Sequence, residues 1–356
     1  MNDRSTGTDT DADVDTDTHP HPNTDPGTVF VAGSTGVLGR RLVTRLSERG
    51  HDVIGLVRDD RGASLVRERG GEPRRGDVLE RESLESAASG ADVVIHAATA
   101  IPTDGKPSAA DWERNDRVRL EGTTNLLDAA ESIGADRFLL QSIVWVARQH
   151  DGRPFDEDAP PNPDRTTRSA LEAERLLEST AQTGGLDAVT LRCGWFYAHD
   201  AAHTRQFGRL LANGRMPIVG GGLLGREDAT LSCLHVDDAA DAFAAAAEGE
   251  ETGRYHVVDE KPTTFASFLR TFADRLGASP PRRLPGWLVR PLLGRASVRL
   301  LTSSMPTTND RFRAAFDWEP SVPTVEVGLE RVIDRWLEEG SLRERRTDGG
   351  YEWTDE

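Results

Sequence analysis

The strongest constraint on the fold is a short glycine-rich turn near the start of the chain. Residues 29–39 read VFVAGSTGVLG, so an apolar run is followed by three evenly spaced glycines and an amphipathic segment at 37–49. This pattern predicts strand, tight turn and helix, with the glycines bringing the backbone close to a pyrophosphate at the helix N-terminus. The residues predicted to bind a dinucleotide are Gly33, Ser34, Thr35, Gly36, Val37, Leu38 and Gly39.

Apolar runs and helical segments then alternate through the first half of the chain. Further strands are predicted at 53–57, 93–95, 138–140 and 189–191, and helices at 83–88, 120–133 and 169–180. Alternating strands and helices indicate an α/β fold: a doubly wound parallel Rossmann sheet with helices on both faces.

After residue 191 this rhythm stops, and a smaller C-terminal substrate lobe is predicted. Its elements are expected at 239–247, 255–258, 265–276, 309–316 and 324–336. Between them, the apolar segment 284–293 (LPGWLVRPLL) fits a loop covering the lobe's core or a membrane-surface patch, and the covering loop is favoured. The predicted domains are a disordered acidic tail at 1–27, an NAD(P)-binding Rossmann core at 28–192, a substrate lobe with interleaved core elements at 193–340, and a polar tail at 341–356.

The composition is acidic and poor in lysine. The 356 residues carry a formal charge of −17, and the only lysines are Lys106 and Lys261. Such a surface favours a halophilic protein, since high salt screens the self-repulsion; an Arg-rich, GC-rich genome is the alternative. Without a basic stripe, nucleic acid is not an expected partner.

The remaining composition points to a cytoplasmic protein with a small-molecule substrate. Cys193 and Cys233 form neither a disulfide framework nor a metal pattern. No apolar run is long enough for a transmembrane segment, and no signal-peptide h-region is present. No metal site is predicted, and no Gly-x-Ser-x-Gly elbow supports a serine hydrolase.

The end of the second predicted strand bears on the choice of cofactor. An acidic side chain there would accept hydrogen bonds from the adenosine ribose, whereas an Arg would accommodate a 2′-phosphate. The strand ends Val57-Arg58-Asp59, so NADP is favoured through Arg58, with Arg40 as a possible reinforcement. Asp59 leaves NAD open.

Further motifs follow in a fixed order: Gly76-Asp77-Val78, Ile95-His96-Ala97-Ala98, GTTNLL at 122–127, Leu191-Arg192 with Tyr197, His235-Val236-Asp237-Asp238, and Trp318-Glu319-Pro320. In this order they resemble the extended short-chain dehydrogenase/reductase family, the NAD(P)-dependent epimerase/dehydratase group. The resemblance covers residues 28–336. It implies that Asp77 and Val78 contact the adenine and that Ala97 and Ala98 lie along the cofactor.

The chain departs from that family where the chemistry is done. Family members use a Tyr-x-x-x-Lys pair, in which the Tyr is the acid/base and the Lys lowers its pKa. The resemblance aligns these positions with Thr166 and Ala170. The family's catalytic Ser or Thr aligns with Ser142 or with Ile143, which leaves Ser142 as a candidate catalytic residue. Arg119 stands where the family usually has a helix Asn, just before the GTTNLL motif.

Three further residues are weaker candidates. Tyr197 and His199 follow the sixth strand and could donate a proton, although a packed aromatic and a surface His are the more common roles. His235 precedes Asp237 and Asp238, which suit a helix N-terminus, so a capping role is expected there.

Two functions therefore remain open. One is an atypical NADP-dependent oxidoreductase or epimerase acting on a small carbonyl, alcohol or nucleotide-sugar-like substrate. The other is a non-catalytic dinucleotide-binding protein, resembling the complex I accessory subunit or redox-sensing regulators of this superfamily. The helices at 120–133 and 169–180 resemble those that pair in family dimers, so a homodimer is possible.

Overall fold

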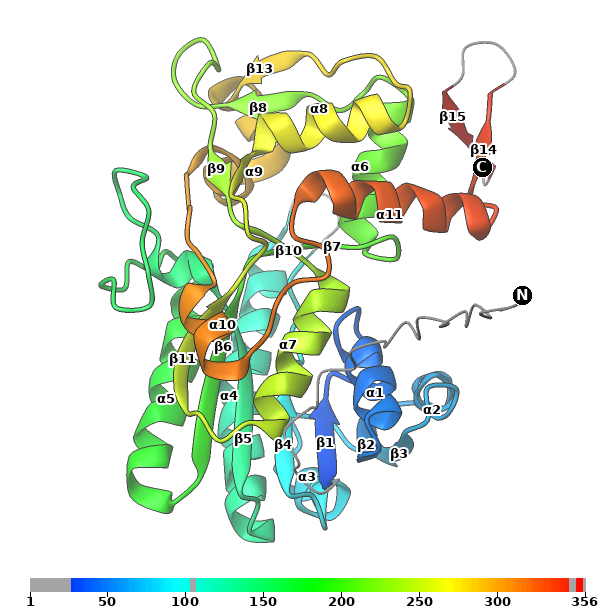
Figure 1. The fold of residues 1–356 in the computed structure, drawn as a ribbon. Helices are drawn as coiled ribbons and strands as arrows, with labels where there is room; N and C mark the ends of the chain where they lie inside the picture. Colours follow the sequence, from blue (N-terminus) through cyan, green and yellow to red (C-terminus); the bar gives the residue numbers. More distant parts are fainter. Residues whose placement is uncertain (1–26, 103–106, 346–349, 355–356) are drawn as a thin grey trace, which may run out of the picture.

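The computed structural model describes residues 27–102, 107–345 and 350–354. Its centre is a seven-stranded parallel sheet in the order β11-β6-β5-β4-β1-β2-β3 (Figure 1). The strands are β1 (Thr28–Ala32), β2 (Asp52–Val57), β3 (Glu72–Arg75), β4 (Val93–His96), β5 (Arg137–Ile143), β6 (Asp187–Cys193) and β11 (Gly253–Val257). The predicted doubly wound parallel sheet is confirmed.

Helices cover both faces of the sheet and divide its core into two apolar layers. Side chains of α1, α2, α7 and α10 pack on one face, and those of α3, α4 and α5 pack on the other. These helices are α1 (Gly39–Glu48), α2 (Asp60–Arg67), α7 (Val236–Glu248), α10 (Asp310–Phe316), α3 (Arg81–Ala88), α4 (Ala109–Ile133) and α5 (Arg168–Gly184). The predicted helix at 120–133 is therefore only the second half of α4, which Ser108 starts with a capping box.

The strand order reverses at β1, which pairs with β4 on one side and β2 on the other. Ligands of doubly wound sheets bind outside the carboxyl ends of the strands at such a switch point. The glycine turn follows β1, and the motifs at 76–78 and 95–98 follow or end β3 and β4. The topology thus brings these predicted cofactor contacts to one edge of the sheet.

A smaller lobe stands above this edge in Figure 1. It has a separate apolar core with Phe265, Phe268, Phe272 and Trp336 at its centre. Its helices are α6 (Ala202–Ala212), α8 (Phe265–Arg275), α9 (Gly286–Thr302) and α11 (Val325–Glu338). Its short strands are β7 (Trp195–Tyr197), β8 (Ile218–Gly220), β9 (Thr230–Leu231), β10 (Cys233–His235), β12 (Thr263–Thr264) and β13 (Arg283–Pro285). After the first lobe elements, β11 joins the central sheet and α7 and α10 pack on it.

One expectation for the C-terminal part was wrong. Residues 284–293 are not a covering loop, because β13 ends at Pro285 and α9 begins at Gly286. The first turns of α9 expose Trp287, Leu288 and Leu292 instead of burying them. The segment expected as a polar tail contains a hairpin, β14 (Leu342–Glu344) with β15 (Tyr351–Trp353), whose Trp353 ring lies 4.7 Å from that of Trp336.

In the described ranges, no helix combines the length and apolar character needed to cross a membrane. The same ranges contain no group of three or more His, Cys, Asp or Glu side chains placed to hold a metal ion.

Candidate functional site

The glycine turn between β1 and α1 has no room for side chains. Gly33 has a φ of +90°, and a Cβ there would lie 2.6 Å from the Ala98 nitrogen. A Cβ on Gly39 would lie 1.9 Å from the Gly33 carbonyl oxygen. The turn is therefore held closely against the end of β4, with the free N–H groups of the α1 N-terminus at the sheet edge. This is a cradle of the kind that a pyrophosphate occupies.

The other residues of the turn differ in their surroundings. Thr35 and Gly36 are exposed and Val37 is half-buried, so this part of the backbone can be reached by a ligand. Ser34 and Leu38 are buried. The Ser34 hydroxyl donates to the Leu56 carbonyl at 2.7 Å, which ties the turn to β2. Ser34 thus stabilises the turn through its side chain.

The first turn of α1 is connected to the lobe by ion pairs. Arg40 and Arg41 reach Asp200, at 2.6 and 3.0 Å, and Arg41 also pairs with Asp237 at the start of α7. Burial lowers the pKa of Arg40, with Asp200 opposing that effect. The Arg40 side chain, which was predicted to support Arg58, is engaged with Asp200 instead.

At the end of β2, Asp59 and Arg58 are the two side chains that bear on the choice of cofactor, and Asp59 already has a structural role. Asp59 caps α2, its carboxylate accepting from the Gly62 N–H at 2.7 Å. Val57 is buried, and Arg58 is exposed. Arg58 is thus exposed at this strand end and, unlike Asp59, does not cap α2.

The two remaining groups of predicted cofactor residues border the same edge. Asn125 on α4 donates to the Val78 carbonyl at 2.9 Å, which fixes the loop that carries Asp77. Beyond β4, the Ala98 N–H donates to Nδ1 of His96 at 3.3 Å. Burial lowers the pKa of His96 to about 4, so its ring is neutral and can accept this bond.

The start of α5 contains the two positions aligned with the family's Tyr and Lys. Thr166 precedes the helix, and its hydroxyl donates to Asp164 at 2.7 Å. Ala170 lies in the first turn of α5 and packs in the apolar core. The side chains at these two positions therefore face a carboxylate and the protein interior.

Arg119 of α4 brings a buried positive charge to this place. Its guanidinium donates to the Thr166 carbonyl at 3.2 Å, and the residue is 7% exposed. Burial lowers the pKa of Arg119 to about 10, so the group stays charged near neutral pH. The sequence marked Arg119 only as a departure from the family, since its neighbour Thr166 is 47 residues away along the chain.

Ser142, predicted as a candidate catalytic residue, lies in a closed polar network inside the protein. Its hydroxyl donates to Glu174 of α5, which also forms a two-bond ion pair with Arg192 at 2.9 and 2.6 Å. Both side chains of the ion pair are 0% exposed. These contacts give Ser142 a role in joining β5, β6 and α5.

Tyr197, the second candidate catalytic residue, is also enclosed. It is 0% exposed, and its hydroxyl donates to Asp259 at 3.0 Å. A Cβ on Gly328 of α11 would lie 2.2 Å from the Tyr197 hydroxyl oxygen, so the helix covers the ring. Burial raises the pKa of Tyr197 well above its ordinary value. These surroundings favour the packed-aromatic role.

The two histidine candidates have structural partners. His199 lies 3.3 Å from Glu339 and its carbonyl accepts from Trp336. The expected capping at the start of α7 is confirmed, with the His235 ring as the acceptor from the Asp237 N–H.

Several buried polar atoms near the ends of β4 and β5 lack a hydrogen-bond partner. Asn115 of α4 accepts from the Ala100 N–H at 3.2 Å, but its Nδ2 donates to no described group. Trp145 Nε1, just beyond β5, and Ser169 Oγ, at the start of α5, are likewise unpartnered. Unpaired buried donors are costly, so they mark positions where polar atoms of a ligand would fit.

An aromatic surface continues from this point into the lobe. The rings of Trp145 and Trp195 lie 5.8 Å apart, and Trp195 also contacts His203 and Phe265. Phe207 completes the cluster beside His203 and Phe265. Trp145, Trp195, His203 and Phe207 are only partly buried. No periodic pattern in the sequence indicates this cluster, because its members come from β7, α6, α8 and the segment after β5.

The fold and the cradle together define a dinucleotide-binding α/β protein. The model of the NAD dependent epimerase/dehydratase family matches residues 29–258. The chain belongs to this family.

Among curated relatives, a 3-diazoavenalumate denitrifying reductase from a Streptomyces species is 40% identical over 320 residues, which cover 85% of this chain and 99% of the relative. A 3 beta-hydroxysteroid dehydrogenase/Delta 5-->4-isomerase of Mycobacterium tuberculosis is 28% identical over 282 residues, covering 75% and 74%. The solved UDP-glucose 4-epimerase of Thermus thermophilus, in complex with NAD, has a TM-score of 0.72 at 23% identity and covers 87% of this chain and 99% of that one. These relatives support an NAD(P)-binding oxidoreductase or epimerase.

Proposed function

We propose that this protein is an NADP(H)-dependent reductase whose substrate accepts a hydride without taking a proton from the family's Tyr–Lys positions. The observation that carries the proposal is the environment of those positions. Thr166 donates its hydroxyl to Asp164, and Ala170 is packed in the core. An alcohol with an ordinary hydroxyl is a poor general acid, since catalytic groups work best when their pKa lies near the operating pH.

The residues at the sheet edge fit the dinucleotide. The turn from Gly33 to Gly39 would hold its pyrophosphate, and Asp77, Val78, Ala97 and Ala98 would line it. Arg58 would meet a 2′-phosphate, which makes NADP the proposed cofactor and NAD the alternative, because Asp59 is engaged in capping α2. When bound, the dinucleotide supplies the hydride.

Arg119 would hold the start of α5 in place beside the dinucleotide. It is buried, charged and bonded to the Thr166 carbonyl. A buried hydrogen bond from a charged donor is strong, so Arg119 would fix the Thr166 backbone at the site.

The aromatic cluster favours a flat aromatic substrate over a nucleotide sugar. Rings such as Trp145 and Trp195 offer apolar surface, and the unpartnered Nε1 of Trp145 could bond one polar atom of the substrate. The Streptomyces relative is named for a denitrifying reduction of a diazo compound. In an arenediazonium ion the arriving hydride forms a C–H bond while the C–N bond breaks, and the C–N electron pair leaves with N₂. The carbon is reduced, the nicotinamide is oxidised, and no proton is consumed.

A turnover experiment tests the proposal. Purified protein is mixed with NADPH and, in separate reactions, an arenediazonium salt, an aromatic ketone, an aldehyde and UDP-glucose, and the nicotinamide absorbance is followed against protein-free controls. The expected result is consumption of NADPH with the diazonium salt, unchanged within about threefold in Thr166→Val. With NADPH deuterated at C4, deuterium should appear on the product carbon. Consumption with the ketone alone, lost in Thr166→Val, would assign the proton to Thr166 and contradict the proposal.

The non-catalytic alternative predicts a different outcome of the same experiment. Tight binding of NADPH without consumption in any reaction would support a structural or redox-sensing role. The aromatic cluster favours the enzyme, because a protein that only binds nucleotide needs no such second surface.

The physiological state of the protein is also part of the proposal. A cytoplasmic protein is proposed from its two free cysteines, and salt tolerance from its charge of −17. A homodimer is proposed through the outer faces of α4 and α5. Analytical ultracentrifugation at low and high KCl measures solubility and oligomeric state. A monomer at every salt concentration would contradict the proposed dimer.

A further inference from the structure

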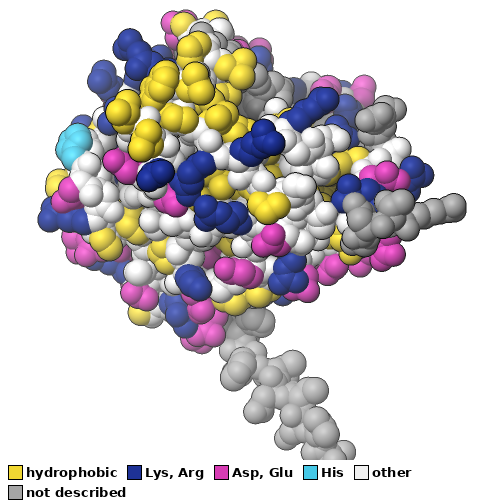
Figure 2. Space-filling view, turned by 90° about the horizontal axis from the view of Figure 1, so that it is seen from above, with side chains coloured by type: hydrophobic (Ala, Val, Ile, Leu, Met, Phe, Trp, Pro, Cys, Tyr) yellow, Lys and Arg dark blue, Asp and Glu magenta, His cyan; other side chains and the backbone are white. Residues whose placement is uncertain are grey.

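A patch of exposed apolar side chains lies at the far end of the lobe. The described chain has seven exposed large hydrophobic residues, and five of them belong to this patch: Leu223, Leu224, Trp287, Leu288 and Leu292. The exposed fractions reach 79% for Leu223, 74% for Leu292 and 58% for Trp287. Seen from above, the hydrophobic side chains gather on one part of the surface, with Lys and Arg side chains beside them (Figure 2).

Two segments distant in the sequence form the patch as one surface. Leu223 and Leu224 lie in the loop between β8 and β9, and the other three residues lie in the first turns of α9. The Trp287 Nε1 donates to the Leu223 carbonyl at 3.0 Å, and β13 pairs with β8 directly beneath. The apolar side chains are thus held at a fixed place rather than left on separate loops.

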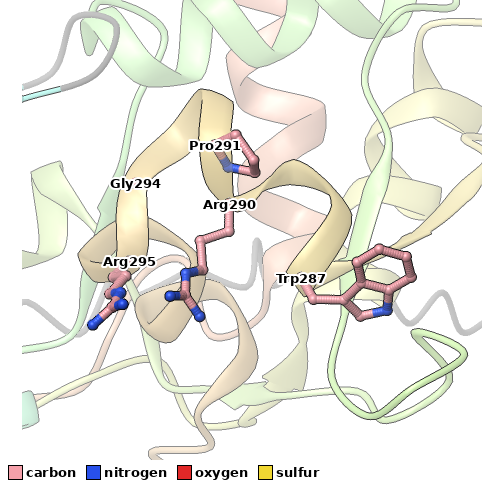
Figure 3. A pocket seen from close by; sticks show the side chains of 5 residues that line it. All are labelled: Trp287, Arg290, Pro291, Gly294 and Arg295. Atoms are coloured by element: carbon pink, nitrogen blue, oxygen red, sulfur yellow. The ribbon is translucent and has the colours of Figure 1, made fainter.

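The charge around the patch is opposite to that of the whole chain. Residues 279–309 contain five Arg and neither Asp nor Glu, in a protein with a net charge of −17. Arg290 and Arg295 are exposed, and no acidic partner for either is found in the described ranges. They extend on the same side of α9 (Figure 3), where a cavity of about 400 Å³ is bordered by Trp287, Arg290, Pro291, Gly294 and Arg295.

The backbone of α9 explains how these two arginines meet. Gly294 has a φ of 82° and a ψ of 164°, so the helix is interrupted there. Pro291 lies one turn earlier and removes a backbone donor. The interruption places Arg290, before the kink, and Arg295, after it, around the same cavity.

We propose that this patch, formed by the β8–β9 loop and the first half of α9, docks the protein on the surface of an anionic lipid bilayer. Trp and Leu side chains would enter the headgroup region, and Arg290 and Arg295 would hold phosphate groups in the cavity between them. Exposed Trp and Leu side chains next to Arg on one helix are the composition of interfacial helices. Trp rings also favour the membrane–water boundary, and Arg stems can lie along apolar surface while the charge meets a phosphate.

Other occupants are less compatible with these charges. A symmetric pairing of two copies through the patch would bring Arg290 and Arg295 of one copy toward those of the other, which like-charge repulsion opposes. The substrate is not a candidate either, since the cavity is lined by α9 residues alone and shares none with the aromatic cluster.

The experiment measures flotation of the full chain with vesicles. One set contains phosphatidylcholine only, and the other contains phosphatidylcholine with phosphatidylglycerol. We expect binding to the anionic vesicles at least about tenfold tighter than to the neutral ones. Trp287→Ser with Leu292→Ser should weaken binding about tenfold or more in any salt, whereas Arg290→Gln with Arg295→Gln should weaken it mainly at low salt.

Matched variants keep the test specific. Val327→Ser removes an apolar side chain that is 38% exposed outside the patch, and Arg67→Gln removes an exposed charge from α2. Both should bind vesicles like the unmodified protein. All variants should retain NADPH binding, which shows that they are folded. No binding to either vesicle set, equal binding by the Trp287/Leu292 variant, or a dimer that this variant abolishes would each overturn the proposal, the last in favour of a protein interface.

Discussion

The two halves of the sheet edge are built in different ways. We call the ends of β1, β2 and β4 the nucleotide half, and the ends of β5 and β6 with the start of α5 the reaction half, after their proposed roles. At the ends of β1, β2 and β4, the backbone itself forms the site, and the glycine spacing leaves little freedom for other residues. At the ends of β5 and β6 and the start of α5, side chains from several elements meet. The comparison teaches that one half of the edge is fixed by backbone geometry and the other by side-chain contacts.

The largest expected effect would come from breaking the nucleotide half at Gly39. In Gly39→Ala, the new Cβ would lie 1.9 Å from the Gly33 carbonyl oxygen, which neither backbone segment can avoid without moving. We expect a loss of about 3 kcal/mol or more in the free energy of unfolding, together with loss of NADPH binding. Thermal melts and titration calorimetry measure both.

Gly184→Ala is the matched control, because its Cβ would meet only the Glu131 carboxylate near the surface, at 3.2 Å. It should bind NADPH normally. If Gly39→Ala also bound NADPH normally and melted at the same temperature, the close packing of the turn would be wrong.

The Arg119→Met variant tests the reaction half of the sheet edge. We expect kcat to fall about tenfold or more, since the Thr166 backbone would lose the buried bond that holds it at the site, with NADPH affinity nearly unchanged. Arg119→Lys should recover part of the rate. Arg117→Met, on the exposed side of the same helix, is the control. Equal rates in Arg119→Met and the unmodified protein would leave Arg119 without a role in the reaction.

Arg58→Asp tests the cofactor choice at the end of β2. The affinity for NADPH should fall about tenfold while that for NADH changes little, because only NADPH has the 2′-phosphate. Arg67→Asp, at the other end of α2, changes the net charge by the same amount and serves as the control. NADH binding at least as tight as NADPH binding in the unmodified protein would contradict the NADP assignment.

Ser142→Ala separates a structural from a catalytic serine. The Glu174–Arg192 pair would lose one buried hydrogen bond, so the free energy of unfolding should fall by about 1–2 kcal/mol. The kcat of the folded fraction should stay the same. The control is Ser179→Ala, because the Ser179 hydroxyl bonds only the Leu176 carbonyl on the surface of α5. This variant should change neither the free energy of unfolding nor kcat. A large fall in kcat without destabilisation would restore Ser142 as a catalytic residue.

A separate effect is a pH dependence of stability at Asp259. Burial raises the pKa of Asp259 to about 8, against 3.8 ordinarily, so the folded state keeps a proton that the unfolded state releases. Stability from this group is therefore fully present below about pH 4 and decreases as the pH rises toward about 8. Asp259→Asn should show a flatter dependence of Tm on pH. The same slope in both proteins would show that Asp259 is ionised in the fold.

The sequence predicted the strand, glycine turn and helix at the start of the fold well for a physical reason. Glycine spacing, strand ends and the strand–helix alternation are local features, and the turn of residues 33–39 follows from them. The family resemblance pointed to Thr166 and Ala170 as the positions aligned with a Tyr and a Lys.

The reaction half depended on contacts that no local pattern specifies. The partners of Ser142 and Tyr197, Glu174 and Asp259, lie 32 and 62 residues away, and only the fold brings them together. The segment 284–293 illustrates the same limit, because its apolar residues predicted a covering role and the helix exposes them.

A pair of isotope effects tests most directly whether the reaction half works without a proton donor. The rate of arenediazonium reduction is measured with NADPH deuterated at C4 and, separately, in D₂O. Hydride transfer without a coupled proton should give a primary effect of about twofold or more with the deuterated cofactor, and a solvent effect near one. A solvent effect of about twofold or more, abolished in Thr166→Val, would show that the chain supplies a proton after all.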